Sequence, residues 1–250
     1  MVQNIETIYH DDDIVVVNKP SGIMVIPDQH TNEDKTLIGI LKEQLNQKIW
    51  VIHRIDKDTS GVLVFARSAE SHRNLSMQFE SFQVYKKYIA LLSGVLEEDE
   101  GIINKPILIS GKYVSIGIIG KESVTKFKVL ERFKSYTLVE AIPLTSRRHQ
   151  VRIHFWSLGY PLAIDAEYGV SDPIMLSRLK RNYKVKRYET EKPLISRLTL
   201  HARSLTLTLP SSSVGKTFEA PFPKDFELTF KQLKKYDKYV TNKAYRCWRW

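Results

Sequence analysis

The segment that most constrains the fold is residues 53–68, which read HRIDKDTSGVLVFARS. Its first half is dense in charge, with four ionisable side chains in five positions: Arg54, Asp56, Lys57 and Asp58. Thr59-Ser60-Gly61 then supplies a turn, because glycine tolerates a positive φ and the two hydroxyls can bond nearby backbone groups. Residues 62–66 are apolar and mostly β-branched or aromatic, which is typical of a buried strand. The pattern predicts a charged loop held by a core strand.

The carboxylates of this loop are candidates for chemistry. A carboxylate between cations, on a loop fixed by a buried strand, is a suitable place for a reactive group. The neighbouring cations favour the ionised form of Asp56, which suits a nucleophile better than a general acid. The alternative is a solvated turn with ordinary ion pairs. The residues alone do not choose between Asp56 and Asp58.

Composition limits the class of protein. The 250 residues suffice for one domain or two closely packed halves, and 42% hydrophobic with 26% charged residues is ordinary for a globular chain. The net charge of +10 predicts a polyanionic partner, nucleic acid before membrane. Cys247 is the single cysteine, which excludes an intrachain disulfide and fits a reducing cytoplasm. No signal peptide is expected, and the longest apolar stretch, around residues 88–96, is too short to span a bilayer.

Apolar periodicity and turn residues predict the elements around this loop. Ser68 can cap a helix with an apolar stripe of Leu75, Phe79 and Phe82, and Thr36 begins another amphipathic helix. The expected helix before the loop is 36–46, and the expected strands are 5–9, 14–17, 84–92, 124–133 and 136–142.

Two lysines and a tyrosine near these strands are candidates for substrate contact. Lys19 lies in the turn Asn18-Lys19-Pro20-Ser21-Gly22, where a lysine is usually solvated. Lys86 and Tyr88 share one face of the strand at 84–92 because strand side chains alternate. A tyrosine beside cations on a strand is more often packing than catalysis.

The stretch 144–154, LTSRRHQVRIH, predicts a basic helix. Thr145 or Ser146 can cap its start, and Gly159 followed by Pro161 ends it. Arg148 and Arg152 are four residues apart, so both guanidinium groups are expected on one side, which suits phosphate or carboxylate. His149 and His154 are five residues apart, about 140° around a helix, and therefore do not share a metal easily. A solvated basic helix is the alternative.

These motifs resemble those of the RluA-type pseudouridine synthases. The family signature is His-Arg-Leu-Asp-x-x-Thr-Ser-Gly, with a catalytic Asp, and Ile55 is the only departure from it here. Further markers follow the family's order between residues 9 and 210: Asn18-Lys19-Pro20-x-Gly22, Lys86-x-Tyr88-x-Ala90, Thr145-Ser146-Arg147-Arg148-His149-Gln150-Val151-Arg152, Asp165-x-x-Tyr168-Gly169 and Leu200-His201-Ala202. Ser146 and Ile164 stand where the family usually has glycine, and Ser146 would be strained if its position requires a positive φ.

The resemblance implies three catalytic residues. Asp56, and not Asp58, would be the catalytic carboxylate, as nucleophile or as base on the sugar. Tyr88 would stack on the target base, a sequence-tolerant contact worth roughly 1–3 kcal/mol per base. Arg152 would pair with the carboxylate and hold it ionised. His201 is expected to be structural.

It also implies a set of substrate-binding residues. Arg54 would help to extrude the target nucleotide, because its reacting atoms are inaccessible in a stacked helix. Lys19 and Arg147 would contact phosphates, and Lys86 would contact substrate beside Tyr88.

The implied fold is α+β: a bent, mostly antiparallel mixed sheet with peripheral helices and a central cleft. Residues 1–222 would form the catalytic domain, in the form without an N-terminal S4 domain, with a basic insert at about 176–192. Residues 223–250 would form a basic, aromatic extension that begins with a packed helix. The insert would contact phosphate or remain a solvated loop, and the final Tyr245, Trp248 and Trp250 would stack on RNA or fray.

The implied reaction is isomerisation of uridine to pseudouridine in structured RNA, without metal or organic cofactor. Ribosomal RNA is preferred over transfer RNA as the substrate, and a cytoplasmic monomer without membrane contact is expected. The competing hypothesis is a non-catalytic RNA-binding or ribosome-assembly protein that retains the synthase fold. The joint presence of Asp56, Tyr88 and Arg152 favours the enzyme.

Overall fold

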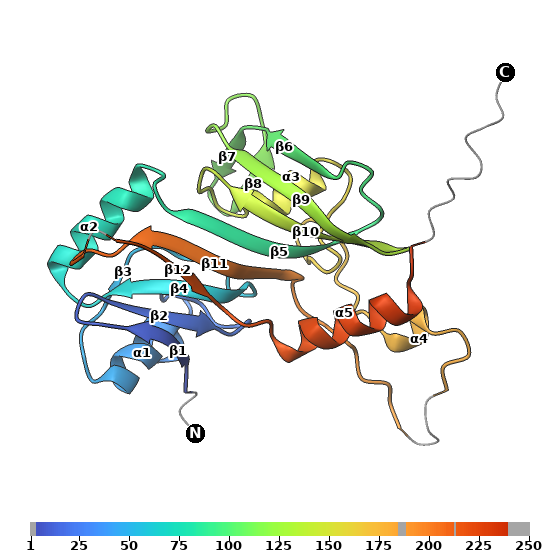
Figure 1. The fold of residues 1–250 in the computed structure, drawn as a ribbon, viewed down its shortest axis with the longest axis horizontal. Coiled ribbons are helices and arrows are strands. Elements are labelled where there is room, and N and C mark those ends of the chain that lie inside the picture. Colours follow the sequence, from blue (N-terminus) through green and yellow to red (C-terminus); the bar gives the residue numbers. More distant parts are fainter. Residues whose placement is uncertain (1–3, 185–188, 213, 240–250) are drawn as a thin grey trace.

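The computed structural model describes residues 4–184, 189–212 and 214–239, and one mixed sheet of ten strands dominates this part of the chain (Figure 1). Its strand order is β1-β2-β4-β11-β5-β10-β9-β6, with β12 paired to β11 and β3 to β4. The strands are β1 (Glu6–His10), β2 (Ile14–Lys19), β3 (Trp50–Val51), β4 (Ser60–Ala66), β5 (Tyr85–Ser93), β6 (Glu100–Asn104), β9 (Val124–Arg132), β10 (Tyr136–Pro143), β11 (Leu200–Thr208) and β12 (Gly215–Glu219).

The remaining elements lie at the periphery of this sheet (Figure 1). A separate two-stranded sheet pairs β7 with β8, and five α-helices and one 3₁₀ helix complete the described part of the chain. They are η1 (Glu33–Lys35), α1 (Leu37–Leu45), α2 (Ala69–Glu80), β7 (Ile107–Ser110), β8 (Tyr113–Ile116), α3 (Gln150–Trp156), α4 (Leu176–Leu179) and α5 (Lys224–Tyr236). The predicted α+β class, with a mostly antiparallel sheet and peripheral helices, is confirmed.

The sheet consists of two halves that β11 joins. Strands β1, β2 and β4 form one half, and β5, β10, β9 and β6 form the other. β11 pairs antiparallel with β5 and parallel with β4. At the parallel junction Gly61 has φ of 119°, and a Cβ there would lie 2.1 Å from the carbonyl oxygen of Ala202. The sequence predicted a positive φ at Gly61, and the approach of β11 explains why no side chain fits.

Three hydrophobic clusters pack against the sheet, one on the first half and two on opposite sides of the second half. The first is built from β2, β4, α1 and the apolar face of β11, and every residue of β4 is buried. The second lies between β5, β10 and α3, and the third lies on the opposite side of β5 and includes α5. Tyr88 on β5 packs against both the first and the second cluster, so its ring lies at their junction.

The helix starts before and after the charged loop agree with the sequence. The side chain of Thr36 accepts a hydrogen bond from the amide of Gly39 at the start of α1, and Ser68 does the same for Ser71 at the start of α2. The predicted stripe on α2 was wrong at its end. Phe82 has a φ of 57° beyond the end of the helix, and its side chain is 51% exposed.

The basic insert and the C-terminal extension both begin with helices. α4 and α5 contact each other, and Phe226 and Leu233 of α5 are buried in the third cluster (Figure 1). Residues 185–188 and 240–250, including Tyr245, Trp248 and Trp250, lie outside the described residues, and the division at residue 222 stays a prediction. Within the described ranges, no helix is both long and apolar enough to cross a membrane.

Candidate active site

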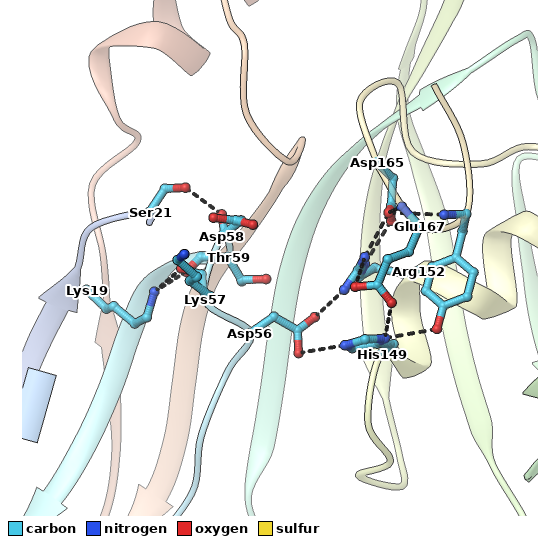
Figure 2. Close-up of polar contacts among 11 residues, drawn as sticks. Lys19, Ser21, Asp56, Lys57, Asp58, Thr59, His149, Arg152, Asp165 and Glu167 are labelled. Atoms are coloured by element: carbon cyan, nitrogen blue, oxygen red, sulfur yellow. Dashed lines mark hydrogen bonds and ion pairs between the residues drawn. The ribbon is translucent and has the colours of Figure 1, made fainter. Parts of the chain in front are cut away.

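Asp56 lies on the loop that leads into β4, and its side chain is 27% exposed. Its Oδ2 accepts a hydrogen bond of 3.1 Å from Nη1 of Arg152, and its Oδ1 lies 3.7 Å from Nε2 of His149 (Figure 2). The neighbouring carboxylate, Asp58, is exposed and is not among the carboxylates that contact Arg152, which are Asp56, Asp165 and Glu167. The structure therefore places Asp56, not Asp58, beside the arginine of the other half.

Lys19 fixes the backbone of this loop by hydrogen bonds. Its side chain is fully buried, and its Nζ donates to the carbonyl oxygens of Lys57 and Thr59 at 2.7 and 2.8 Å (Figure 2). Its third hydrogen bond, of 2.9 Å, goes to the carbonyl oxygen of Pro20. Burial lowers its pKa to about 7, while the charges of Asp58 and Asp56 act in the opposite direction. The predicted phosphate contact of Lys19 is wrong, because its three donors are already engaged by the carbonyl groups of Pro20, Lys57 and Thr59.

Arg152 is fixed from the opposite direction by Asp165. Arg152 belongs to α3, and its side chain is almost fully buried. Its Nε and Nη2 each donate to a carboxylate oxygen of Asp165 at 2.7 Å. Burial alone would lower the pKa of Arg152, but the hydrogen bonds and charge of Asp165, together with Asp56, raise it above its ordinary value. Burial would likewise raise the pKa of Asp165, but Arg152 outweighs it and lowers that pKa. This bidentate contact with Asp165 leaves Nη1 of Arg152 to donate to Asp56.

The start of α3 differs from the prediction. Neither Thr145 nor Ser146 caps the helix; His149 precedes it in the left-handed region, with φ of 54°. The Oε1 of Gln150 accepts from the backbone amide of Arg147 and from the Thr145 hydroxyl, which ties the preceding loop to the helix. Ser146 is not among the residues with positive φ, so it is not strained.

Arg148 does not share a helical face with Arg152, contrary to the prediction. It lies before the first residue of α3, is exposed, and donates from Nη1 to the carbonyl oxygen of Gly111. The i, i+4 argument failed because the helix begins later than the sequence indicated.

A cluster of residues completes the environment of Asp56. The Nδ1 of His149 lies 2.9 Å from the hydroxyl of Tyr168 and 3.3 Å from Glu167, whose other oxygen lies 3.2 Å from Nη2 of Arg152 (Figure 2). The guanidinium of Arg152 also lies over the ring of Tyr168, 5.0 Å from its centroid. Burial lowers the pKa of His149, against the charge of Asp56. His149 therefore contacts the carboxylate as a neutral ring at pH 7.

Two cavities meet at this carboxylate. The larger has a volume of about 920 Å³, and Tyr88, Lys86, Arg147 and the β7–β8 hairpin contribute to its wall. The second, of about 710 Å³, lies on the side of Pro27, Ile164 and Arg197. Asp56 and Arg152 line both. A substrate that enters from either side meets the same ion pair.

Tyr88 and the predicted cations have different surroundings in the larger cavity. Burial raises the pKa of Tyr88 above its ordinary value, and the charge of Asp56 adds to this, so the phenol stays neutral. Arg54 is exposed, lines both cavities and makes no hydrogen bond or ion pair with the described residues. Arg147 donates from Nε to the carbonyl oxygen of Glu122 at 3.3 Å and is only half-buried. Both arginines remain available to a polyanion.

Comparison with known proteins assigns this arrangement to a family. A family model described as RNA pseudouridylate synthase matches residues 13–157. The chain is 32% identical over 231 residues to the ribosomal large subunit pseudouridine synthase C of Buchnera aphidicola, covering 90% of this chain and 70% of that protein. It is 33% identical over 233 residues to the synthase D of Pseudomonas aeruginosa, covering 89% and 69%. The chain belongs to the RNA pseudouridylate synthase family.

A solved structure supports the same assignment. Human RNA pseudouridylate synthase domain containing 1 matches with a TM-score of 0.68 and 26% identity, over 89% of this chain and 85% of that one. The predicted RluA-type membership and pseudouridine synthase fold are confirmed. The enzyme class follows: this synthase is an isomerase that acts on RNA.

Sequence reasoning missed several side chains of the synthase site. Asp165, Glu167 and Tyr168 surround Arg152, although the sequence identified Asp165 and Tyr168 only as late family markers. An acidic residue thirteen positions after a buried arginine is too common a pattern to indicate contact. His201 has the structural position expected, fully buried with Nδ1 3.0 Å from the Ser60 hydroxyl. Among the described residues, no cluster of three or more His, Cys, Asp or Glu could hold a metal ion.

Proposed function

We propose that Asp56 is the catalytic carboxylate of a synthase that converts uridines of ribosomal RNA to pseudouridine. The contact between Asp56 and Arg152, 3.1 Å long and situated where the two cavities meet, carries the proposal. The loop that bears Asp56 is fixed by the hydrogen bonds from Lys19 to Lys57 and Thr59, and Arg152 is fixed by Asp165. Two independently held groups therefore meet in a cavity open to substrate.

The reaction rearranges one nucleotide without gain or loss of atoms. The bond between N1 and C1′ breaks, the base turns while bound, and C5 joins C1′ as it loses its proton, which N1 recovers through solvent. Asp56 starts this sequence as a nucleophile at the sugar or as a base on it. The neutral ring of Tyr88 supplies a face on which the free base stacks. Before the reaction starts, Arg152 holds Asp56 in its ionised form.

The substrate class rests on relatives and on charge. Synthases C and D, named for the large ribosomal subunit, are among the similar proteins, and the net charge of +10 suits a structured polyanion. Arg54 and Arg147 line the larger cavity and provide the phosphate and nucleotide contacts. Ribosomal RNA is therefore proposed over transfer RNA. The monomeric state, the cytoplasmic location and the independence from cofactors stay predictions.

The test is release of tritium from RNA labelled at uridine C5, prepared from cells that lack the gene. The wild-type protein is expected to release tritium, because C5 exchanges its hydrogen for the bond to C1′. Asp56→Asn should release none while retaining RNA affinity within about twofold, because it preserves side-chain shape and removes only the ionised carboxylate. Asp58→Asn is the matched control and should remain active.

The outcomes separate the proposed enzyme from its alternative. Multiple turnover by Asp56→Asn would remove Asp56 from the catalytic role. Tight RNA binding by the wild type and by Asp56→Asn, without tritium release from either, would instead favour a non-catalytic RNA-binding or assembly protein. Mapping of the modified positions in the same RNA identifies the substrate uridines.

A further inference from the structure

Lys86 is a buried cation on the wall of the larger cavity. It lies two residues before Tyr88 on β5, so both side chains leave the same face of the strand. Lys86 is 8% exposed, and both residues line the cavity that also contains Asp56. The next residue, Lys87, points to the other face and forms an ion pair of 3.2 Å with Glu140.

Unlike Lys87, Lys86 has no anionic partner. Among the described residues, no carboxylate or carbonyl oxygen lies within hydrogen-bonding distance of its Nζ. The centroid of the Phe79 ring lies 5.9 Å from Nζ, and the ring of His53 stacks on Phe79 with the two centroids 4.4 Å apart. Burial lowers the pKa of His53 to about 3, so this neighbour is neutral. Burial also lowers the pKa of Lys86 to about 8, and the ammonium form still predominates at pH 7.

An unpaired cation at the buried position of Lys86 lowers the stability of the fold. Burial of a charge without a compensating partner destabilises a fold, and a hydrophobic side chain of the same length would avoid that cost. Among the described residues, the hydroxyl of Thr59, close to Asp56 in sequence, is the side-chain polar atom that is fully buried without a hydrogen-bond partner, and Thr59 lines the same cavity. The cavity thus contains two polar groups that the described protein atoms leave unsatisfied. Such groups are typical of a site completed by its ligand.

We propose that Lys86 is a further catalytic residue, whose ammonium group stabilises the negative charge that the uracil ring acquires during the reaction. When the bond between N1 and C1′ breaks heterolytically, its electron pair stays on the base and is delocalised over N1 and the two carbonyl oxygens. The same charge develops whether Asp56 acts as nucleophile or as base, because in each case N1 leaves C1′ with the bonding electron pair. The charge is lost when C5 bonds to C1′, and the later loss of the C5 proton is balanced by protonation of N1. This inference rests on the proposed function.

The position of Lys86 fits this role better than a phosphate contact. A base that stacks on Tyr88 has its edge beside the neighbouring residues of β5, and Lys86 leaves the same face of that strand. Phosphate contacts in this molecule have exposed or half-exposed candidates in Arg54 and Arg147. A fixed cation acts most strongly on charge that develops beside it during the reaction. Lys86 should therefore affect the rate of the chemical step more than RNA affinity.

The test measures single-turnover tritium release from large-subunit ribosomal RNA labelled at uridine C5, with increasing excess of enzyme. Lys86→Met keeps the length of the side chain and removes its charge. Its rate at saturating enzyme should fall about 10²–10³-fold, with the half-saturating concentration changed less than about threefold. Lys86→Arg restores a cation and should recover at least about tenfold of that loss. Lys87→Met, the neighbour on the opposite face, should stay within about twofold of the wild type.

A second measurement does not depend on activity. The Lys86→Met variant should unfold at a higher denaturant concentration than the wild type, because it removes an unpaired buried charge. A lower midpoint would overturn the inference by showing that the fold needs the lysine. A wild-type rate for Lys86→Met would also overturn it, as would weaker RNA binding with an unchanged saturating rate. Absence of tritium release from the wild-type protein would reject the proposed function itself.

Discussion

The two sides of the site each contain a buried lysine, and the two differ in their partners. Lys19, at the end of β2, gives all three donors to backbone carbonyl groups around Asp56. Lys86, on β5, is nearly as buried but faces the larger cavity without an anionic partner. Side-chain type and burial are thus similar, and only hydrogen-bond satisfaction distinguishes them. The difference indicates that the β2–β4 side is preorganised by the protein, whereas the β5 side is completed by its substrate.

The largest effect is expected where the two sides join. Arg152→Ala should lower the free energy of unfolding by about 3–5 kcal/mol, because Asp165 is left buried without its cation. Activity should be nearly lost, because Asp56 also loses its contact. Denaturant unfolding and tritium release measure the two effects.

Arg178→Ala provides the control for Arg152→Ala. Arg178 also contacts a carboxylate, Asp172, but both side chains are largely exposed. Its loss should change the free energy of unfolding by less than about 1 kcal/mol. Equal effects of the two substitutions would contradict the view that Arg152 is the buried link between the halves.

The two lysines should respond in opposite directions to the same substitution. Lys19→Met should lower the free energy of unfolding by about 2 kcal/mol, because buried carbonyl groups lose their donor. The rate should also fall, since the loop that bears Asp56 is released. Lys57→Met, which removes an exposed cation from the same loop, serves as the control in denaturant unfolding. If Lys19→Met and Lys86→Met shifted stability in the same direction, the distinction between the two sides would fail.

The smallest effect concerns pH. His201 and His154 are fully buried, one bonded to Ser60 near the Asp56 loop and the other to Thr125 of β9. Burial lowers the pKa of each to about 4, below the ordinary value of 6.5. The unfolded chain therefore binds more protons between these values, so stability present above pH 6.5 is lost as the pH falls toward 4.

The free energy of unfolding should be lower at pH 5.5 than at pH 7.5 by about 1 kcal/mol for each of the two buried histidines, His201 and His154. Denaturant unfolding of His201→Gln at both pH values should show a smaller loss than the wild type, whereas His30→Gln, at an exposed position, should not. An unchanged loss in His201→Gln would show that this histidine is not the titrating group.

The sequence predicted those parts of the site that depend on local chemistry. Gly61 takes the positive φ expected of it, and Thr36 and Ser68 cap their helices. These features depend on short patterns in which one residue type has one physical role.

The failures concern the direction in which a side chain points after the chain has folded. A lysine in a turn such as the one at Pro20 is usually solvated. Lys19 is buried instead because residues 57–59 fold against it and their carbonyl groups accept its hydrogen bonds. The pairing of Arg152 with Asp165, and the place of Glu167 beside both, likewise result from tertiary packing. The unpaired state of Lys86 could not be predicted, because it is a property of its surroundings rather than of the residue.

The position of β11 between the two halves has a consequence for the order in which the fold can be completed. Its residues, Leu200–Thr208, follow those of β4 and β5, the strands of the two halves that it joins. Its parallel contact pairs His201 with Ser60, 141 positions away in sequence. Contacts of such long separation form late and slow the overall folding rate. During synthesis, the hairpins of both halves can form while the chain still lacks the strand that aligns them. Asp56 and Arg152 therefore acquire their mutual geometry only after most of the protein has been made, so the proposed catalytic site is incomplete until then.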